Sequence, residues 1–374
     1  GNSNDQSTGN NTFNGNCILT NSGTGYFLMG NTSADTWNSD ATFINSSSSH
    51  FYLAYNSGGN RIKGNTIIQN TGTSGTCNFY FCESGASSSI QFDGTVSILN
   101  GGTASNGVVR FGNKGNTTFL DNITVSSTLG SNSNYGIHLG ISGGSGTCTL
   151  TAGKTITIGS SGYTKGALQF YNFTQAGSQD IALDLSGTAS LLFGSSSTFG
   201  GNISCTSPAL TFNGSTFNGS ASFTKTGSSN ETSNGGNTFQ STLSLQNTGS
   251  GNILMGNTNP DIVNGDLSVL NSGSGYVYLA HNSAGNQYKG NTSLINSGSG
   301  TDNRIQICES TGSTAVFDGN LEAKNTSTAN TAIIRFNLRG TCTFNGNIDL
   351  GCTASGSNTT GIFFSYSGYS GTSS

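Results

Sequence analysis

Short segments of alternating apolar and polar residues, separated by glycine- and serine-rich turns, follow one another along the whole chain. Most of them begin after an apolar anchor residue in a phrase resembling Thr-Phe-Asn-Gly-Asn. The anchors are Phe13, Trp37, Ile62, Phe92, Phe119, Leu150, Phe199, Phe217, Phe239, Val263, Tyr288, Phe317 and Phe344. Successive anchors lie 18 to 31 residues apart, the length of one coil of a β-solenoid. The longer gap after Leu150 predicts an extra coil around Ile181, Leu183 and Leu185.

Each coil contains a first and a second alternating strand after its anchor. Phe92, for example, leads to Val96 and Ile98 in a first strand, and the preceding coil carries Phe79 and Phe81 in its second strand. A period of two places such pairs on one face of a strand. One coil cannot bury that face alone, so the coils are expected to stack. The pattern predicts an all-β, right-handed parallel β-helix, or β-solenoid, of about 14 coils of 18 to 31 residues with no helices.

An asparagine recurs eight residues after many of the anchors, at the end of the first strand. These asparagines are Asn21, Asn45, Asn70, Asn100, Asn247, Asn271, Asn296 and Asn325. Stacked asparagines can hydrogen-bond from one rung to the next, as in cross-β ladders. Asparagine also tolerates turn geometry anywhere, but this explains its constant register less well. We therefore expect a structural asparagine ladder at one corner of the coil.

A longer period lies above the coil period. Phe13 corresponds to Phe239 at an offset of 226 residues, and after one deletion the match continues at 225. We divide the chain into a first super-repeat, residues 1–234, and an incomplete second one, residues 235–374, which continues the same rod. Because a new super-repeat starts before the sequence ends, we expect this rod to be a segment of a longer protein.

Composition and charge exclude several classes of protein. Only 7% of the residues are charged, and the net charge is −4. The basic residues are scattered singly, so no cluster for nucleic-acid phosphates exists. No apolar run approaches the length of a membrane helix. The 22 phenylalanines and 12 tyrosines favour a packed interior over disorder. We expect no nucleic-acid partner and no membrane insertion.

Catalytic and metal sites find little support in the sequence. Parallel β-helices include polysaccharide lyases and hydrolases, and glycoside hydrolysis needs two carboxyl groups about 5–10 Å apart. The sixteen acidic residues are thinly spread, and Asp93 and Asp318 occupy a turn slot where asparagine is common. The three histidines lack the spacing of metal ligands. We therefore expect no enzyme, no catalytic residue, no metal and no cofactor.

The eight cysteines occupy positions typical of a core. Cys82 and Cys308 each precede a glutamate in the same context, in a slot that other coils fill with Gly, Ala or Met. Free cysteine packs at such a position as a small hydrophobe. Core packing is favoured, and local disulfides between Cys77 and Cys82 and between Cys342 and Cys352 are the alternatives.

The outward slot of the second strand is rich in aromatic residues and arginine. The slot contains Phe27, Tyr52, Tyr80, Arg110 and His138 in the first copy, and Ile253, Tyr278, Gln306, Arg335 and Phe363 in the second. An exposed stripe of this composition is typical of an interface core. Three interpretations stay open: contact between protomers, stacking on sugar rings, and cross-strand pairing that stabilises the sheet.

The sequence as a whole resembles the Gly/Asn/Ser/Thr-rich repeats of giant proteins that gliding and predatory marine bacteria export to their surface. The resemblance rests on phrases at Gly235–Phe239, Asn247–Asp261 and Tyr278–Gln287. It implies a very long secreted polypeptide whose β-solenoid rods associate into filaments or grappling-hook-like appendages. The recurring Phe-x-Gly-Asn element is also similar to the Phe-x-x-Asn motif of chlamydial polymorphic membrane proteins, although their Gly-Gly-Ala motif is missing here.

The super-repeat decides between the functional interpretations. A rod lengthens by duplication, whereas an enzyme rarely duplicates its active-site scaffold in tandem. We therefore expect a structural or adhesive segment of an extracellular, cell-surface filament. Its partners would be copies of itself packed side by side, with surface glycans or another cell's surface as further contacts. The alternative is a β-helix that binds or cleaves carbohydrate. An ice-binding solenoid would need flat threonine ladders, and threonine here moves between slots.

Overall fold

The computed structural model describes residues 3–73, 76–103, 106–130, 134–365 and 372–373. The chain divides into two compact units, residues 1–201 (unit 1) and 202–374 (unit 2). Within the described residues the secondary structure is β-strand, and no helix is long and apolar enough to cross a membrane. The boundary between the units falls before the start of the second super-repeat at residue 235, so the compact units and the sequence period are different divisions of the chain.

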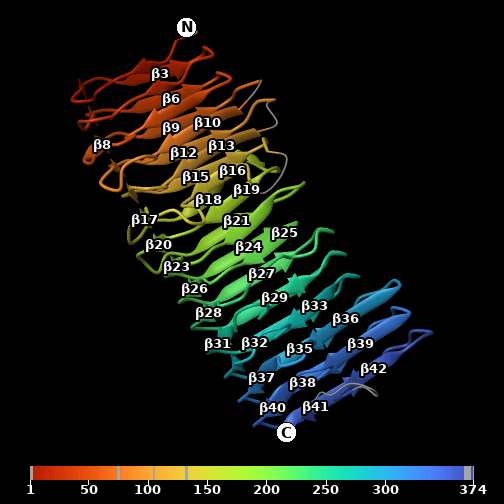
Figure 1. Ribbon diagram of the computed structural model, residues 1–374. Helices are drawn as coiled ribbons and strands as arrows, with labels where there is room; N and C mark the ends of the chain where they lie inside the picture. Colours follow the sequence, from red (N-terminus) through yellow and green to blue (C-terminus); the bar gives the residue numbers. More distant parts are fainter. Residues whose placement is uncertain (1–2, 74–75, 104–105, 131–133, 366–371, 374) are drawn as a thin grey trace. The chain divides into compact units, whose positions relative to one another are not determined.

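Unit 1 contains three parallel stacks of strands, one for each position in the coil (Figure 1). The anchor strands are β2 (Thr12–Phe13), β5 (Thr36–Trp37), β8 (Asn60–Ile62), β11 (Ser89–Phe92), β14 (Asn116–Phe119), β17 (Cys148–Leu150), β20 (Phe173–Gln175) and β23 (Thr198–Phe199). The first strands are β3 (Cys17–Asn21), β6 (Ala41–Asn45), β9 (Thr66–Asn70), β12 (Val96–Asn100), β15 (Ile123–Ser127), β18 (Ile156–Tyr163) and β21 (Ile181–Asp184). The second strands are β1 (Asp5–Gln6), β4 (Phe27–Leu28), β7 (His50–Leu53), β10 (Thr76–Phe81), β13 (Asn106–Phe111), β16 (Gly136–Leu139), β19 (Ala167–Phe170) and β22 (Ser190–Phe193).

Unit 2 repeats this arrangement (Figure 1). Its anchor strands are β26 (Thr216–Phe217), β28 (Thr238–Phe239), β31 (Ile262–Val263), β34 (Asn286–Tyr288), β37 (Thr314–Phe317), β40 (Thr341–Phe344) and β43 (Thr372–Ser373). Its first strands are β24 (Ile203–Ser207), β27 (Ala221–Lys225), β29 (Leu243–Asn247), β32 (Leu267–Asn271), β35 (Thr292–Asn296), β38 (Leu321–Asn325) and β41 (Ile348–Cys352). Its second strands are β25 (Ala209–Phe212), β30 (Ile253–Leu254), β33 (Tyr276–Leu279), β36 (Asp302–Ile307), β39 (Thr331–Phe336) and β42 (Thr360–Phe363).

The predicted fold class is confirmed: the chain is an all-β parallel solenoid of about 13 turns, close to the number expected. The long gap between anchors does hold an extra turn, with β20, β21 and β22 as its three strands. In that turn the anchor slot opposite Leu150 is filled by Gln175, which explains why the anchor pattern skips it. The right-handed sense of the coil stays a prediction.

Stacked aromatic side chains fill the interior of each unit. Phe92 lies parallel to Phe119 with ring centroids 5.2 Å apart, and Phe317 stacks on Phe344 at 5.3 Å. Offset stacking at this distance is favourable beyond simple burial. The strand spacing of about 4.8 Å in a parallel sheet brings equivalent side chains to this separation. In-register pairing therefore stacks the anchor residues of successive coils, with aromatic runs separated by aliphatic anchors such as Leu150 and Val263.

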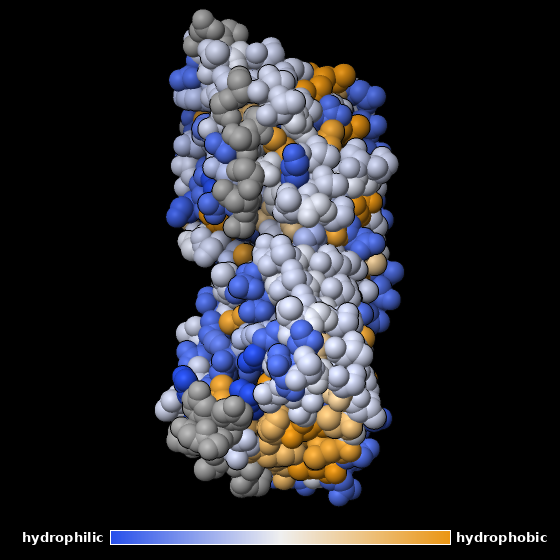
Figure 2. Space-filling view, turned by 90° about the vertical axis from the view of Figure 1, so that its right-hand side faces the viewer, coloured by the Kyte–Doolittle hydropathy of each residue, from blue (hydrophilic) through white to orange (hydrophobic). Residues whose placement is uncertain are grey.

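Two of the exposed large apolar side chains belong to an inward row. Ile348 and Leu350 occupy the inward slots of β41 and are 42% and 47% exposed. They pair with Leu321 and Ala323 of the preceding turn, which are buried. Figure 2 shows an apolar patch near the end of unit 2 at which Figure 1 marks the C-terminus.

Candidate functional site

The outward slot of the second strands forms one continuous row in each unit. The row consists of Leu28, Tyr52, Tyr80, Arg110, His138, Gln169 and Leu192 in unit 1, and of Leu254, Tyr278, Gln306, Arg335 and Phe363 in unit 2. Most of these side chains are half-buried, whereas Leu28, His138, Gln306 and Arg335 are buried. The predicted stripe is therefore less exposed than expected, because neighbouring side chains of the row cover one another.

Strand pairing places Leu28, and not the predicted Phe27, in this row, although Leu28 is buried and Phe27 is half-buried. Phe27 pairs with the inward-facing Phe51, and their ring centroids lie 4.9 Å apart. Ile253, in the matching position of unit 2, is buried opposite Val277. Strands β4 and β30 are only two residues long, so the alternation of apolar and polar residues is too short to fix which side faces outward.

Around this row unit 1 carries a tyrosine–arginine cluster, composed of His50, Tyr52, Tyr55, Tyr80, Glu83 and Arg110. The ring of Tyr52 lies 5.1 Å from that of Tyr55 and 5.4 Å from that of Tyr80. The Arg110 guanidinium lies over the Tyr80 ring at 4.3 Å and forms an ion pair with Glu83. A planar guanidinium is well suited to stack on a ring and bind a carboxylate at once.

The cluster of unit 1 is partly desolvated, and its ionisable groups respond to this. Burial raises the pKa of the Tyr52 hydroxyl to about 12 and lowers the pKa of His50, to which Arg110 also contributes. Burial raises the pKa of Glu83, although Arg110 acts in the opposite direction. Glu83 Oε2 has no hydrogen-bond partner among the described residues. At neutral pH the cluster thus presents neutral rings around a single arginine–glutamate pair.

His138 follows Arg110 in the row of unit 1. Its ring is only 6% exposed, and burial lowers its pKa to about 3, with a further contribution from Arg110. The imidazole is therefore neutral at physiological pH. It packs beneath the surface, so it acts as part of the sheet and not as a contact residue.

Unit 2 carries an equivalent cluster, composed of Tyr276, Tyr278, His281, Asp302, Arg304 and Glu309. Arg304 lies over the Tyr276 ring at 5.0 Å and binds Asp302 through two hydrogen bonds of 2.7 Å. The Tyr276 hydroxyl donates to the same carboxylate, and burial raises the pKa of Tyr276 to about 12. This cluster again combines an arginine, a tyrosine face and a carboxylate.

A second polar contact in this cluster joins His281 to Glu309, whose Oε2 lies 3.5 Å from His281 Nε2. Asn257 Oδ1 lies 3.1 Å from the other ring nitrogen. Burial lowers the pKa of His281 and raises that of Glu309. Because the ring is then neutral near pH 7, the contact is not a full ion pair.

The asparagines predicted to form a ladder are buried and lie in register. In unit 1 Asn21, Asn45, Asn70 and Asn100 pair in sequence, and in unit 2 Asn247, Asn271, Asn296 and Asn325 do the same. Asn70 Nδ2 donates to Asn100 Oδ1 at 2.8 Å and to the carbonyl of Cys77 at 2.9 Å. Each asparagine therefore joins its own turn to the next and also fixes the bend before the second strand.

The ladder ends where another residue takes the slot. Ser127 follows Asn100, and Tyr163 follows Ser127 after a bulge in β18. In unit 2 Lys225 precedes Asn247. Tyr163 accepts a hydrogen bond from the backbone N–H of Ile137 at 3.1 Å, so a different side chain fulfils the same role there.

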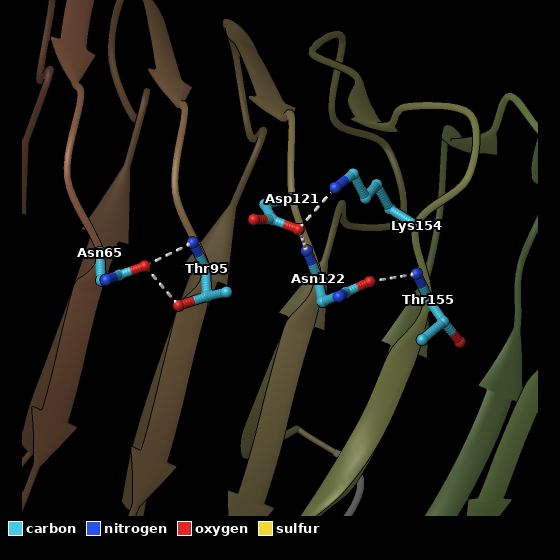
Figure 3. A network of polar contacts seen from close by, with 6 residues as sticks. All are labelled: Asn65, Thr95, Asp121, Asn122, Lys154 and Thr155. Carbon is cyan, nitrogen blue, oxygen red and sulfur yellow. Dashed lines mark hydrogen bonds and ion pairs between the residues drawn. The ribbon is translucent and has the colours of Figure 1, made fainter.

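A second ladder, which the sequence pattern did not reveal, runs along the corner before the first strands (Figure 3). Asn65 Oδ1 accepts hydrogen bonds from both the backbone N–H and the hydroxyl of Thr95, at 3.1 and 2.7 Å. Asn122 Oδ1 accepts from the backbone N–H of Thr155 at 2.9 Å. Lys154 forms an ion pair of 2.8 Å with Asp121. The short polar phrase after an anchor, Lys-Gly-Asn after Ile62 or Leu-Asp-Asn after Phe119, is the available signal, but by itself it indicates only a turn.

A third, buried ladder makes the same hydrogen bonds in both super-repeats. In unit 2 Asp261 Oδ1 accepts from the backbone N–H and the amide of Asn237, both at 2.8 Å. The backbone N–H of Asp261 donates to Asn286 Oδ1 at 2.9 Å. In unit 1 the corresponding residues Asn11, Asp35 and Asn60 make the same contacts. Burial raises the pKa of Asp261 to about 6, although these N–H groups favour its charged form.

A shallow groove with a volume of about 610 Å³ lies on the outer face of the first strands of unit 2. The outward row beneath it consists of Ser244, Ser268, Ser293, Glu322 and Asp349, which pair in register from one turn to the next. Lys324 forms an ion pair with Glu322 and lowers its pKa. The groove thus changes from hydroxyl groups at one end to carboxylates at the other.

Cysteines and metal ligands complete the inventory of reactive groups. The eight cysteines are thiols, six of which are buried, while Cys352 is exposed and Cys17 is half-buried. Cys342 lies against Cys308 and not against Cys352, so the alternative of a local pair does not describe this geometry. Among the described residues no three His, Cys, Asp or Glu side chains gather in a way that could hold a metal ion.

Comparison of the chain with protein-family models, with curated proteins and with solved structures gives no match.

Proposed function

We propose that the chain is a structural and adhesive segment of a long extracellular filament, in which copies pack side by side through the tyrosine–arginine clusters. The observation that carries the proposal is that both units place an arginine stacked on a tyrosine, beside a carboxylate, on or next to their second strands, although not at equivalent positions. Tyrosine and arginine are enriched at the centres of protein interfaces, because they bury a large area while keeping a polar group.

The geometry of the clusters supports a contact role over a purely internal one. In unit 1 the side chains of Arg110 and Glu83 keep about a fifth of their surface exposed, at 21% and 18%. The pair is therefore preorganised on the surface and already partly desolvated. A partner that covers it would lose little side-chain entropy on binding.

Association can be tested with a variant that removes the cluster of unit 1, Tyr52→Ser with Tyr80→Ser and Arg110→Ser. We expect the wild-type chain to form laterally packed assemblies and this variant to lose them, as measured by analytical ultracentrifugation and negative-stain electron microscopy. Tyr52→Phe with Tyr80→Phe keeps the rings and should keep association.

A second surface supplies the matched control for this experiment. Ile18 and Ile67 are the large exposed apolar side chains of unit 1, at 70% and 42%, and they lie on the first strands. Ile18→Ser with Ile67→Ser should leave association unchanged. If this variant alone dissociates the assemblies, or if the wild-type chain stays monomeric at high concentration, the proposed interface is wrong.

Carbohydrate binding is the second candidate, and the groove of unit 2 favours it. Serine hydroxyls, turn asparagines and the carboxylates of Glu322 and Asp349 offer hydrogen-bonding groups at the spacing of neighbouring strands. Because Lys324 holds Glu322 in its charged form, binding suits the site better than acid catalysis, which requires a raised pKa. Glycan-array binding that is lost in Glu322→Gln with Asp349→Asn, while lateral assembly persists, would favour this candidate.

A further inference from the structure

Two buried thiols from consecutive turns of unit 2 lie in contact. Cys308 follows β36, Cys342 lies in β40, and their sulfur atoms are 3.3 Å apart. Both side chains are fully buried. Neither the coil pattern nor the super-repeat requires cysteine at both positions, so the pair needs its own explanation.

The backbone already holds the two residues together. The N–H of Gly340 donates to the carbonyl of Cys308 at 3.1 Å, and the Cys308 thiol donates to the carbonyl of Thr341 at 3.3 Å. A disulfide needs its sulfurs about 2.0 Å apart, so an approach of little more than 1 Å closes the bond. Side-chain rotation can supply most of that movement.

The conformation of Cys308 strengthens the case. Its φ angle is +54°, in the left-handed region that favours glycine, and Ala280 and Gly256 occupy this slot in earlier turns of unit 2. A cysteine gains nothing from the backbone there. The contacts of the thiol, and not the backbone conformation, must therefore account for a cysteine at this position.

Unit 1 provides a natural comparison. Cys82, the super-repeat equivalent of Cys308, has a φ angle of +55° and donates to the carbonyl of Asn116 at 3.3 Å. Its neighbour is Thr117, whose hydroxyl lies 4.0 Å from the Cys82 sulfur. The two sites thus share a backbone arrangement and differ in one partner, threonine in unit 1 and cysteine in unit 2.

We infer that Cys308 and Cys342 form a disulfide that locks two consecutive turns of unit 2. The two thiols lose two protons and two electrons as the S–S bond forms. A low-molecular-weight disulfide such as oxidised glutathione accepts them and is cleaved to two thiols. Because thiolate access controls the exchange and both thiols are buried, the bond is expected to form during folding. The inference does not depend on the proposed filament role.

The test compares the full chain produced in an oxidising compartment with the same chain produced under reducing conditions. Cys352→Ser serves as the background, because the exposed Cys352 thiol could otherwise pair between molecules. Free thiols are alkylated under denaturing conditions, and peptides are mapped by mass spectrometry without reduction. We expect a Cys308–Cys342 linked peptide and two fewer alkylated cysteines in the oxidised sample.

Two variants make the outcome specific. Cys342→Thr copies the partner found in unit 1, so it should fold and lose the linked peptide. Thr117→Cys places a thiol beside Cys82 and should add a second linked peptide in unit 1. The oxidised protein should also unfold at a higher urea concentration than the reduced protein, and Cys342→Thr should abolish this shift.

Three results would overturn the inference. The first is complete alkylation of both cysteines when the oxidised protein is denatured without reduction. The second is a linkage of Cys308 to a different cysteine. The third is a linked protein whose unfolding midpoint equals that of the reduced form, which would remove the locking role.

Discussion

Units 1 and 2 form the same outer cluster from different residues. In unit 1 Arg110 stacks on Tyr80 and pairs with Glu83. In unit 2 Arg304 stacks on Tyr276 and pairs with Asp302. These three residues do not occupy the super-repeat positions of the first three, since Arg304 corresponds to Asn78 and Asp302 to Thr76. A stacked arginine with a carboxylate is therefore present in both copies although its position has moved.

This difference shows which feature of the surface matters. If the side chains served only to stabilise the sheet, any good cross-strand pair would suffice at each position. Instead, both units contain a cation over an aromatic face beside an acid. The composition of the patch, and not the identity of a single slot, is what the duplication reproduces.

The interiors of the two units, unlike their surfaces, keep the same positions, and unit 2 differs by additional buried residues. The asparagine ladder and the aromatic stacks occupy equivalent slots in both units, but unit 2 also holds a buried Lys225 and a buried Glu231. Residues 226–237 form no second strand, and Glu231 faces inward there. Predictions that separate the two units follow from these contrasts.

The largest effect is expected from removing an aromatic anchor, Phe92→Ala in unit 1 or Phe317→Ala in unit 2. Both side chains are buried and stacked, so each change should cost about 4 kcal/mol in the unit that carries it. Solenoid turns contact mainly their neighbours, so the other unit should keep its stability. Trp37, the single tryptophan, reports unfolding of unit 1 by fluorescence, and hydrogen exchange reports both units. Equal loss of protection in both units would show one cooperative block.

The buried charges of unit 2 should give the next largest effect. Lys225 fills the ladder slot before Asn247, and its ammonium donates to the carbonyl of Gly227 at 2.8 Å. Burial raises the pKa of Glu231 to about 8, and Lys225 acts in the opposite direction. Lys225→Asn therefore removes both the bond to Gly227 and this positive neighbour, and it should cost up to about 3 kcal/mol. Adding Glu231→Ile, to match the inward Ile253 of the following turn, removes the buried carboxyl but also the acceptor of the Leu210 N–H at 2.8 Å, and should restore part of the lost stability. Urea unfolding of the single and double variants measures this, and a double variant weaker than the single would contradict it.

The coil period and the asparagine ladder could be predicted from the sequence, whereas the buried position of Glu231 could not. The coil period and the asparagine register recur along the chain, so this repetition predicts both the fold and the ladder. Glu231 lies in a polar run, Asn-Glu-Thr-Ser-Asn, that is typical of a loop, and only stacking between neighbouring turns brings it inside. The place of Phe27 failed for a related reason, because a two-residue strand has no alternation to fix its phase.

The sequence also could not predict contacts between side chains of different turns. The Cys308–Cys342 contact spans 34 residues and depends on the bend that brings Gly340 to Cys308. The stacked arginine is Arg110 in unit 1 and Arg304 in unit 2, and this difference cannot be predicted without knowing which ring lies beneath each guanidinium. The sequence pattern predicts the position of a residue in the coil, whereas packing between turns decides which side chain that residue contacts.

The pH dependence of unit 2 should reveal Asp261. Burial raises its pKa to about 6, whereas the unfolded chain releases this proton near the usual value of about 4. Between these values the folded state holds a proton that the unfolded state has lost, so the contribution of Asp261 to stability falls as the pH rises. Relative to Asp261→Asn, the wild-type protein should lose about 2 to 3 kcal/mol between pH 4 and pH 7. Parallel urea-unfolding curves for the two proteins over this range would contradict the assignment.

The smallest predicted effect comes from the asparagine ladder, where both units should respond alike. Asn70→Ala in unit 1 removes the donor to the carbonyl of Cys77, and Asn296→Ala in unit 2 removes the donor to the carbonyl of Asn303. Each change leaves a buried backbone carbonyl without that bond and should cost about 1 to 2 kcal/mol. Gln69→Ala, at the neighbouring outward position, should change stability by no more than about 0.5 kcal/mol. Equal effects of the two asparagine changes, measured by urea unfolding and hydrogen exchange, would mean that the ladder belongs to the coil, while the differences between the units lie in the cluster, the cysteine pair and the buried charges.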